Sequence, residues 1–68
     1  MQAIIQWKNK YSGEIGYVGS VSAKERCFHN ADRGGAKNFK SQKSADKAIE
    51  QLKEYGEAEN NDFYVICV

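Results

Sequence analysis

The chain has 68 residues, a mass of 7.7 kDa and a formal net charge of +1. A chain of this length buries only about 60% of the surface that its unfolded form exposes, so residues 1–68 are expected to form a single small domain. Such a domain has too little core to enclose a deep cofactor cleft, and we therefore expect neither enzyme activity nor a cofactor. The hydrophobic and charged fractions, 41% and 28%, are those of a folded globular protein.

The charges are distributed unevenly along the chain. Residues 1–43 carry eight basic and three acidic residues, whereas residues 44–68 carry two basic and six acidic ones. The two parts therefore have net charges of +5 and −4, which predicts a dipolar surface. The overall pI of about 7.7 differs from that of strongly basic nucleic-acid-binding domains, which is usually above about 9.

Cysteine content and hydropathy indicate the compartment. Cys27 and Cys67 are the only cysteines, whereas disulfide-stabilised mini-proteins usually have about four or more. The longest apolar stretch, residues 63–68, is far shorter than the roughly 20 residues of a membrane span, and the first seven residues do not resemble a signal peptide. We expect a reduced cytoplasmic protein that does not contact a membrane.

The first half of the chain is predicted to form three strands. Apolar and polar residues alternate over residues 3–8 and 15–22, which is typical of half-buried strands. The turn between them, residues 9–13, contains Asn, Ser and Gly and indicates a hairpin. Residues 26–30 are predicted to form a short third strand. One face of the second strand is expected to carry Ile15, Tyr17 and Val21.

A helix is predicted in the second half of the chain. Ser41 is the expected N-cap, because its hydroxyl can accept a hydrogen bond from a first-turn N–H group. Gly56, which tolerates a positive φ, is expected to follow the helix. Between them, apolar residues recur at helical spacing and form one stripe, which consists of Ala45, Ala48, Ile49, Leu52 and Tyr55.

The end of the chain is predicted to form a last strand. Residues 63–68 are apolar on both faces, as is typical of a central strand. The predicted fold is therefore an α+β domain with the order β-β-β-α-β, in which one helix packs on one face of a largely antiparallel sheet. Since one helix covers only one face, Trp7, Tyr17, Tyr64 or Ile66 is expected on the uncovered side. An exposed apolar or aromatic face favours a partner or self-association.

Three patterns in the sequence resemble catalytic, metal or cofactor sites, and each is predicted to have a structural role instead. Cys27 and His29 share a strand face, but a nucleophilic pair also needs an orienting group and an oxyanion site. Cys67 would complete three zinc ligands only if the last strand lay beside the third, so we expect no metal site. The glycines of residues 13–19 lack the spacing and the context of a dinucleotide-binding loop and are predicted to be turn or bulge glycines.

A basic segment precedes the predicted helix. Its cations lie within eleven residues that contain no acid, in a loop that begins with Asp-Arg-Gly-Gly; they are Arg33, Lys37, Lys40 and Lys43. The N–H groups and the dipole of the helix start also attract anions. The segment is either a solvated loop or a binding site for an anionic partner, which would be a nucleic acid or an acidic protein surface.

An acidic cluster follows the helix. It contains Glu50, Glu54, Glu57, Glu59 and Asp62. Acids near a helix C-terminus oppose the helix dipole, so their role is either solubility or the binding of a basic partner. For the second role, the interface candidates are Glu54, Glu57 and Glu59.

One segment resembles part of a known family. Residues 36–49 contain Phe-x-Ser-x-x-x-Ala followed by further alanines at helical spacing, which resembles the passage from the last strand into the helix in the arm-type DNA-binding domains of phage and transposon integrases. The resemblance covers about residues 14–55. It implies a three-stranded sheet that reads DNA, with contacts from Lys24, Arg26 and residues 33–43.

We therefore expect a small non-enzymatic binding module, most in keeping with a protein-interaction or inhibitor-type protein of phage, mobile-element or bacterial origin. A protein partner would be engaged through a sheet edge, the uncovered face or a charged end, with Trp7, Tyr17 and Tyr64 as candidate contacts. The alternative is a DNA-binding module that uses the basic segment. A homodimer through a sheet edge or face is compatible with both hypotheses.

Overall fold

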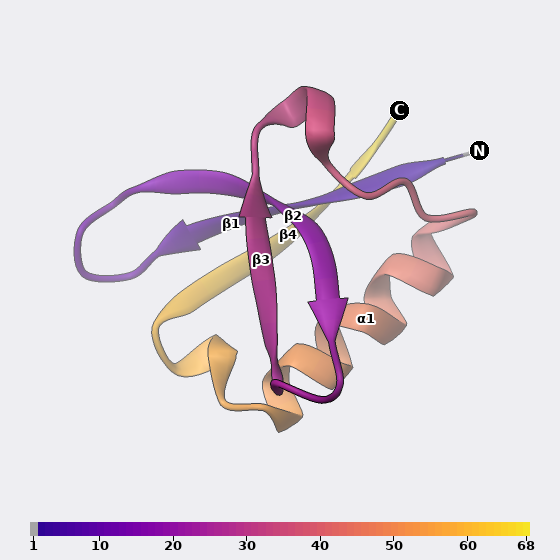
Figure 1. Ribbon diagram of the computed structural model, residues 1–68. Coiled ribbons are helices and arrows are strands. Elements are labelled where there is room, and N and C mark those ends of the chain that lie inside the picture. Colours follow the sequence, from indigo (N-terminus) through magenta and orange to yellow (C-terminus); the bar gives the residue numbers. More distant parts are fainter. Residues whose placement is uncertain (1) are drawn as a thin grey trace.

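The computed structural model describes residues 2–68 and shows the predicted α+β architecture (Figure 1). One helix packs against a four-stranded antiparallel sheet with the strand order β3-β2-β1-β4. The predicted order of elements, β-β-β-α-β, is confirmed. The elements are β1 (Ala3–Asn9), β2 (Ile15–Ser22), β3 (Cys27–Ala31), the 3₁₀ helix η1 (Arg33–Gly35), α1 (Gln42–Glu54), the 3₁₀ helix η2 (Glu57–Glu59) and β4 (Asn61–Cys67).

The turn between β1 and β2 is built by Asn9. Its side-chain oxygen accepts hydrogen bonds from the backbone N–H groups of Tyr11 and Ser12, both at 2.9 Å. Gly13 completes the turn with a φ of 76°, a conformation that glycine adopts without steric cost. The hairpin predicted from the Asn, Ser and Gly residues is therefore confirmed.

A bulge in β2 changes which residues face the core. The register between β2 and β3 shifts between Val18 and Ser20, so the alternation of side chains is interrupted there. Val18 is fully buried, whereas Ile15 is exposed, and Val21 packs against the core only because it follows the bulge. Ile15 and Tyr17 share a face as predicted, whereas the prediction that Val21 shares it is wrong.

The position of β4 in the sheet also differs from the prediction. β4 pairs with β1 alone and is an edge strand, whereas it was predicted to be central. Phe63 and Val65 pack against the helix side of the core, while Tyr64 and Ile66 point to the other side of the sheet. β4 contributes apolar side chains to both faces of the sheet although it is an edge strand. Apolar residues on both faces of a strand therefore did not show whether it is central.

The helix begins and ends as predicted. The hydroxyl of Ser41 accepts a hydrogen bond from the backbone N–H of Ser44 at 3.2 Å, and Gly56 follows the helix with a φ of 88°. The residues that the helix buries are Ala45, Ala48, Ile49 and Leu52. Within residues 2–68, no helix has the length and the apolar character needed to cross a membrane.

The core lies between α1 and one face of the sheet. From the sheet it contains Ala3, Ile5 and Trp7 of β1, which alternate along the strand. An aromatic row extends from Trp7 to Phe28 and Phe63, with ring centroids 6.0 Å and 5.6 Å apart. Aromatic pairs at such distances stabilise a core beyond the effect of the area they bury.

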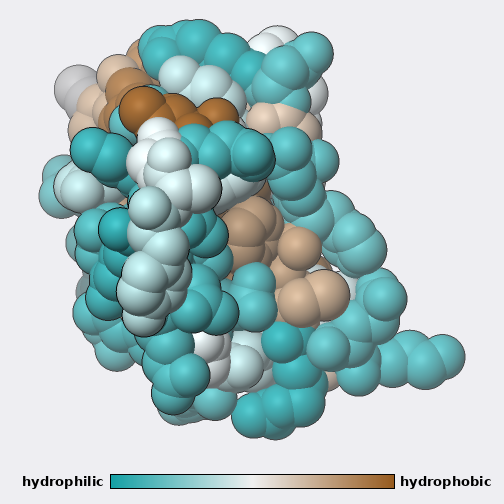
Figure 2. Space-filling model, turned by 90° about the vertical axis from the view of Figure 1, so that its left-hand side faces the viewer, coloured by the Kyte–Doolittle hydropathy of each residue, from teal (hydrophilic) through white to brown (hydrophobic). Residues whose placement is uncertain are grey.

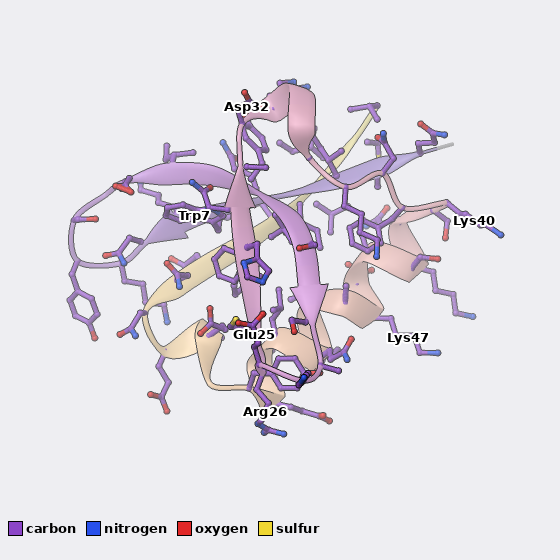
Figure 3. All side chains as sticks on the ribbon, viewed as in Figure 1. Trp7, Glu25, Arg26, Asp32, Lys40 and Lys47 are labelled. Atoms are coloured by element: carbon purple, nitrogen blue, oxygen red, sulfur yellow. The ribbon has the colours of Figure 1, made fainter. Side chains whose placement is uncertain are left out.

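The tip of the β2–β3 hairpin contacts the C-terminal end of α1. The Arg26 guanidinium donates a hydrogen bond to the backbone carbonyl of Glu54 at 3.3 Å and lies 4.9 Å from the centroid of the Tyr55 ring. Figure 3 shows Arg26 beside the end of the helix. The φ of Arg26 is 55°, which is unfavourable for a residue with a Cβ. The contacts of its side chain therefore offset a backbone cost.

Replacing Arg26 separates these two effects. Arg26→Ala is expected to lower the free energy of unfolding by about 1 kcal/mol, because it removes the hydrogen bond and the cation–π contact and keeps the backbone cost. Arg26→Gly is expected to be nearly neutral, because glycine removes that cost, which is of order 1 kcal/mol. Urea denaturation of both variants tests this prediction. Equal losses in the two variants would show that the backbone conformation contributes nothing.

Candidate functional site

The face of the sheet opposite α1 carries no α-helix in the described part of the chain, and η1 touches it through Arg33. Residues paired directly across antiparallel strands have their side chains on the same side. Gln6 is paired with both Tyr17 and Tyr64, so these three side chains form a row across β2, β1 and β4. We call the part of this surface on β1, β4 and the start of β2 the helix-free face, and its residues are Ile4, Gln6, Lys8, Ile15, Tyr17, Asp62, Tyr64 and Ile66. On β3 and the end of β2 the same side of the sheet continues with Ser20, Ser22, Cys27, His29 and Ala31.

Two large side chains on the helix-free face are exposed, whereas Ile4, at 4% exposure, is buried. Ile15 is 55% exposed and Tyr64 47%, while Tyr17 and Ile66 are half-buried. Figure 2, which views the molecule from the side of the β1–β2 turn, shows hydrophobic surface near the upper edge and in the middle of a largely hydrophilic surface. Exposed apolar groups that gather on one surface are typical of interaction sites, whereas single ones are not.

Trp7 does not belong to this face. It is only 8% exposed and lies in the core on the helix side, where its indole N–H donates a hydrogen bond to the side-chain oxygen of Asn30 at 2.9 Å. The expectation that Trp7 lines the uncovered side is therefore wrong. It shares the phase of Ala3 and Ile5 along β1, and that alternation already indicated a core position.

The four basic residues of the predicted segment do not form one patch. The Arg33 guanidinium carbon lies 5.8 Å from the centroid of the Tyr17 ring, and its Nη1 donates a hydrogen bond to the Tyr17 hydroxyl at 3.5 Å. Lys37 instead lies over the ring of Phe39, 5.4 Å from its centroid. Arg33 therefore joins the helix-free face and Lys37 does not.

The other two lysines lie at the start of α1. Lys40 precedes the N-cap, and Lys43 is in the first turn. In Figure 3, Lys40 lies far from Asp32, the neighbour of Arg33. Because the first turn contains no acidic residue, the helix N-terminus is a positive end separate from the helix-free face.

The acidic candidates lie at the opposite end of the helix. Glu54 ends α1, while Glu57 and Glu59 belong to η2. Glu57 is half-buried and the other two are exposed. The carbonyl of Glu54 is already bonded to Arg26, so only its carboxylate is available to a partner. The helix therefore separates a positive end from a negative end, as the charge distribution along the chain predicts.

Glu25, Cys27 and His29 form a cluster on the β2–β3 hairpin. One ligand atom from each lies within 4.8 Å of the others, and Nε2 of His29 is 3.0 Å from a carboxylate oxygen of Glu25. Burial, followed by the negative charges of Glu25 and Glu57, raises the pKa of the Cys27 thiol. A raised pKa keeps this thiol protonated, which is the reverse of what a catalytic cysteine needs.

This cluster differs from the one considered in the sequence. Cys67 lies on β4 and Cys27 on β3, at opposite edges of the sheet, so Cys67 cannot join His29 there. Glu25 takes its place, and sequence reasoning missed it because it lies outside the predicted third strand. The spacing Glu-x-Cys-x-His at residues 25–29 is the signal that could have identified it.

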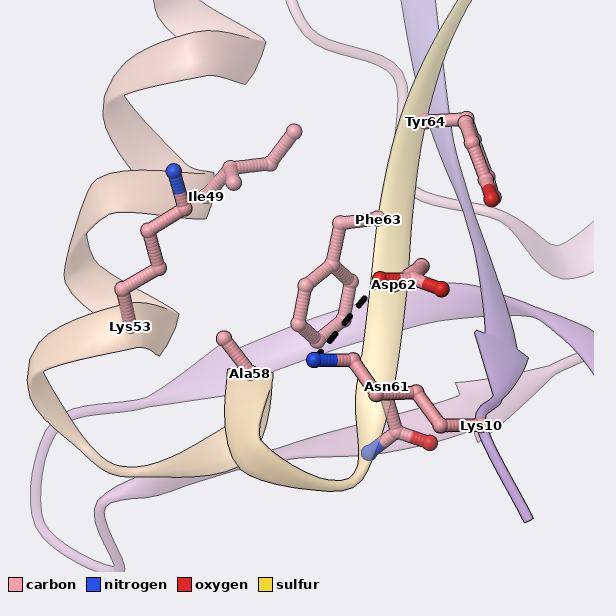
Figure 4. A pocket seen from close by; sticks show the side chains of 8 residues that line it. All are labelled: Lys10, Ile49, Lys53, Ala58, Asn61, Asp62, Phe63 and Tyr64. Carbon is pink, nitrogen blue, oxygen red and sulfur yellow. Dashed lines mark ion pairs between the residues drawn. The ribbon is translucent and has the colours of Figure 1, made fainter.

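A groove of about 320 Å³ lies between α1, η2 and β4 (Figure 4). Its volume is at the lower end of the range for ligand pockets, roughly 300–1,000 Å³. Its two cations are already paired, Lys10 with Asp62 at 3.9 Å and Lys53 with Glu50 at 3.5 Å. The groove therefore offers a small ligand apolar contact and little unpaired charge. Its lining residues are Lys10, Ile49, Lys53, Ala58, Asn61, Asp62, Phe63 and Tyr64.

Comparison of the chain with models of protein families, with curated proteins and with solved structures finds no match. The resemblance of residues 14–55 to integrase arm-binding domains therefore stays a prediction. The surfaces of this chain that are available for binding are the helix-free face, the two charged ends of the helix and the hairpin cluster.

Proposed function

We propose that the protein is a non-enzymatic protein-binding module whose helix-free face docks onto a protein partner. The observation that carries this proposal is the row of Tyr17, Gln6 and Tyr64 across three strands, beside the exposed side chain of Ile15. Tyrosines contribute strongly to protein interfaces, because they bury a large area and lose little conformational freedom.

The composition of the helix-free face favours a protein over a nucleic acid. Its only cation on the sheet is Lys8, and Asp62 shares the same row. Arg33 adds a second positive charge at the rim, against the Tyr17 ring. Phosphate recognition relies on several cations, whereas protein interfaces are enriched in aromatic residues and arginine and depleted in lysine.

The size of the molecule is compatible with such an interface. A standard protein–protein interface buries about 800 Å² on each partner, which is roughly a fifth of the 4460 Å² surface of this chain. The partner would therefore cover most of one face of the sheet. An inhibitor-type role would follow if the surface it covers on the partner is a functional one.

A second candidate function is nucleic-acid binding through the start of α1. It is favoured by the positions of Lys40 and Lys43 beside a helix N-terminus with no acidic residue in its first turn, an arrangement that attracts phosphate. Arg33 and Lys37 would contribute less, because each lies against an aromatic ring.

Paired variants of exposed residues test the proposed function. Ile15→Ser with Tyr64→Ser is expected to reduce capture of the partner from a nuclease-treated lysate at least tenfold, since losing two apolar contacts costs more than about 1.4 kcal/mol. Tyr11→Ser is the matched control, because Tyr11 is 80% exposed and belongs to the turn. Quantitative mass spectrometry of captured proteins gives the measurement.

Charge-reversal variants and self-association complete the experiment. Lys40→Glu with Lys43→Glu should leave the captured protein unchanged. If these variants abolish capture and the Ile15/Tyr64 pair does not, the helix N-terminus is the site and the proposal is wrong.

Binding of a labelled oligonucleotide that weakens by about 0.9 log units per log unit of salt for each phosphate would support the second function. A dimer in sedimentation that Ile15→Ser with Tyr64→Ser dissociates would show that the face binds a second copy of this chain instead.

A further inference from the structure

The β2–β3 hairpin brings together three side chains with different metal-binding atoms. Cys27 and His29 are at alternate positions of β3 and therefore share a face. Glu25 lies in the turn before the strand, and the left-handed backbone of Arg26 separates it from Cys27. The result is a thiol, an imidazole and a carboxylate whose ligand atoms lie within 4.8 Å of one another.

We propose that Glu25, Cys27 and His29 form a binding site for Zn²⁺ or another divalent transition metal of similar softness. Cys27 and His29 lie on the same side of the sheet as Tyr17, but on β3 and away from the row of Tyr17, Gln6 and Tyr64, and the proposal does not rest on the proposed function. Tetrahedral zinc with ordinary bond lengths of about 2.0–2.3 Å holds its ligand atoms roughly 3.3–3.6 Å apart. The ligand atoms observed here lie within 4.8 Å of one another, so the side chains must draw closer together to bind the ion.

The donor set selects the class of metal. Mg²⁺ and Ca²⁺ prefer oxygen ligands, and this cluster offers only one carboxylate. Thiolate and imidazole donors favour zinc and its transition-metal neighbours. The half-buried position of Cys27 removes part of the water that would otherwise compete for the metal.

The local charge also favours a cation. The Glu25 carboxylate belongs to the cluster, so a divalent ion would meet a negative charge there, and on binding it would displace the proton of the Cys27 thiol. Three protein ligands leave a fourth position for water. In the described structure Glu25 and His29 are 3.0 Å apart, and the metal would replace this pair by bridging the two side chains.

Titration of the tag-free chain with Co²⁺, followed by competition with Zn²⁺, tests the site. We expect a thiolate-to-cobalt charge-transfer band in the near ultraviolet, together with the visible bands of tetrahedral cobalt, at one metal per chain. Cys27→Ser should abolish the charge-transfer band, and Glu25→Gln should weaken apparent affinity at least tenfold. Cys67→Ser is the matched control, because it removes the other thiol from the opposite edge of the sheet.

Several outcomes of the cobalt titration would contradict the proposed site. Bands that survive Cys27→Ser and disappear in Cys67→Ser would overturn the proposal, as would a stoichiometry of two chains per metal or the absence of any thiolate band. Amide chemical shifts recorded with Zn²⁺ provide a second measurement. Shifts confined to residues 23–31 would support the site, whereas shifts centred on η2 and the groove would show that the acidic end binds the ion instead.

Discussion

Leu52→Ala is expected to lower the free energy of unfolding by about 2–5 kcal/mol, the range for removing a large buried aliphatic side chain. Leu52 is 0% exposed and lies in the core between α1 and the sheet. A domain of 68 residues has a total stability of only about 3–10 kcal/mol, so this one change removes a large share of it. Urea denaturation followed by far-ultraviolet circular dichroism measures the loss.

Lys47→Ala is the matched control for this prediction. Lys47 lies on the exposed side of the same helix (Figure 3), and alanine favours a helix at least as well as lysine does. Its effect on the free energy of unfolding should stay within about 0.5 kcal/mol. A loss below about 1 kcal/mol for Leu52→Ala would mean that α1 is not packed on the sheet as described.

The helix was predictable in detail because its signals are local. Ser41 and Gly56 act through hydrogen bonding and backbone conformation within one turn of the chain. The apolar stripe from Ala45 to Tyr55 depends only on helical periodicity, although its last member, Tyr55, is the C-cap and is half-buried. The cap and the glycine that follows the helix are confirmed. They were predictable because no contact with the rest of the protein is needed to specify them.

The sheet was predictable only in part because strand neighbours are set by long-range contacts. The alternation in β1 identified Ala3, Ile5 and Trp7 as one face, which the structure confirms. Nothing in residues 63–68 shows that their neighbour is β1 and that their other edge is unpaired. The prediction of turn or bulge glycines in residues 13–19 is confirmed by the bulge at Gly19, but its effect on Val21 was hidden. That effect depends on how β2 meets Ala31, whose Cβ would be 2.8 Å from a Cβ at Gly19.

The candidate sites show the same division. The sequence indicated an aromatic face containing Tyr17 and Tyr64, and the structure places both on the helix-free face. It did not indicate that Arg33 lies against Tyr17 or that Glu25 lies against His29. The second contact depends on a left-handed arginine at position 26, a conformation that sequence reasoning assigns to glycine or asparagine.

Gly16→Ala is expected to destabilise the protein by about 1–3 kcal/mol, the usual cost of forcing extra volume into a packed core. Gly16 is paired with Trp7 across β1 and β2, and the indole ring lies over it. A Cβ at this position would approach Cζ2 and Cε2 of Trp7 to 2.5 and 2.6 Å and would also collide with the side-chain oxygen of Asn30. The indole would have to move, and its hydrogen bond to Asn30 would weaken or break.

The single tryptophan makes this change directly observable. In Gly16→Ala the fluorescence emission should shift to longer wavelength as Trp7 becomes more exposed to water, and the midpoint of urea denaturation should fall. Gly34→Ala is the control, since the nearest atom to its new Cβ is 3.6 Å away and the substitution lies outside the core. Wild-type emission and stability in Gly16→Ala would show that the indole does not lie over Gly16. The expected loss is large because Gly16 of β2 has no side chain opposite Trp7 of β1, and the indole ring fills the space that a side chain at position 16 would need.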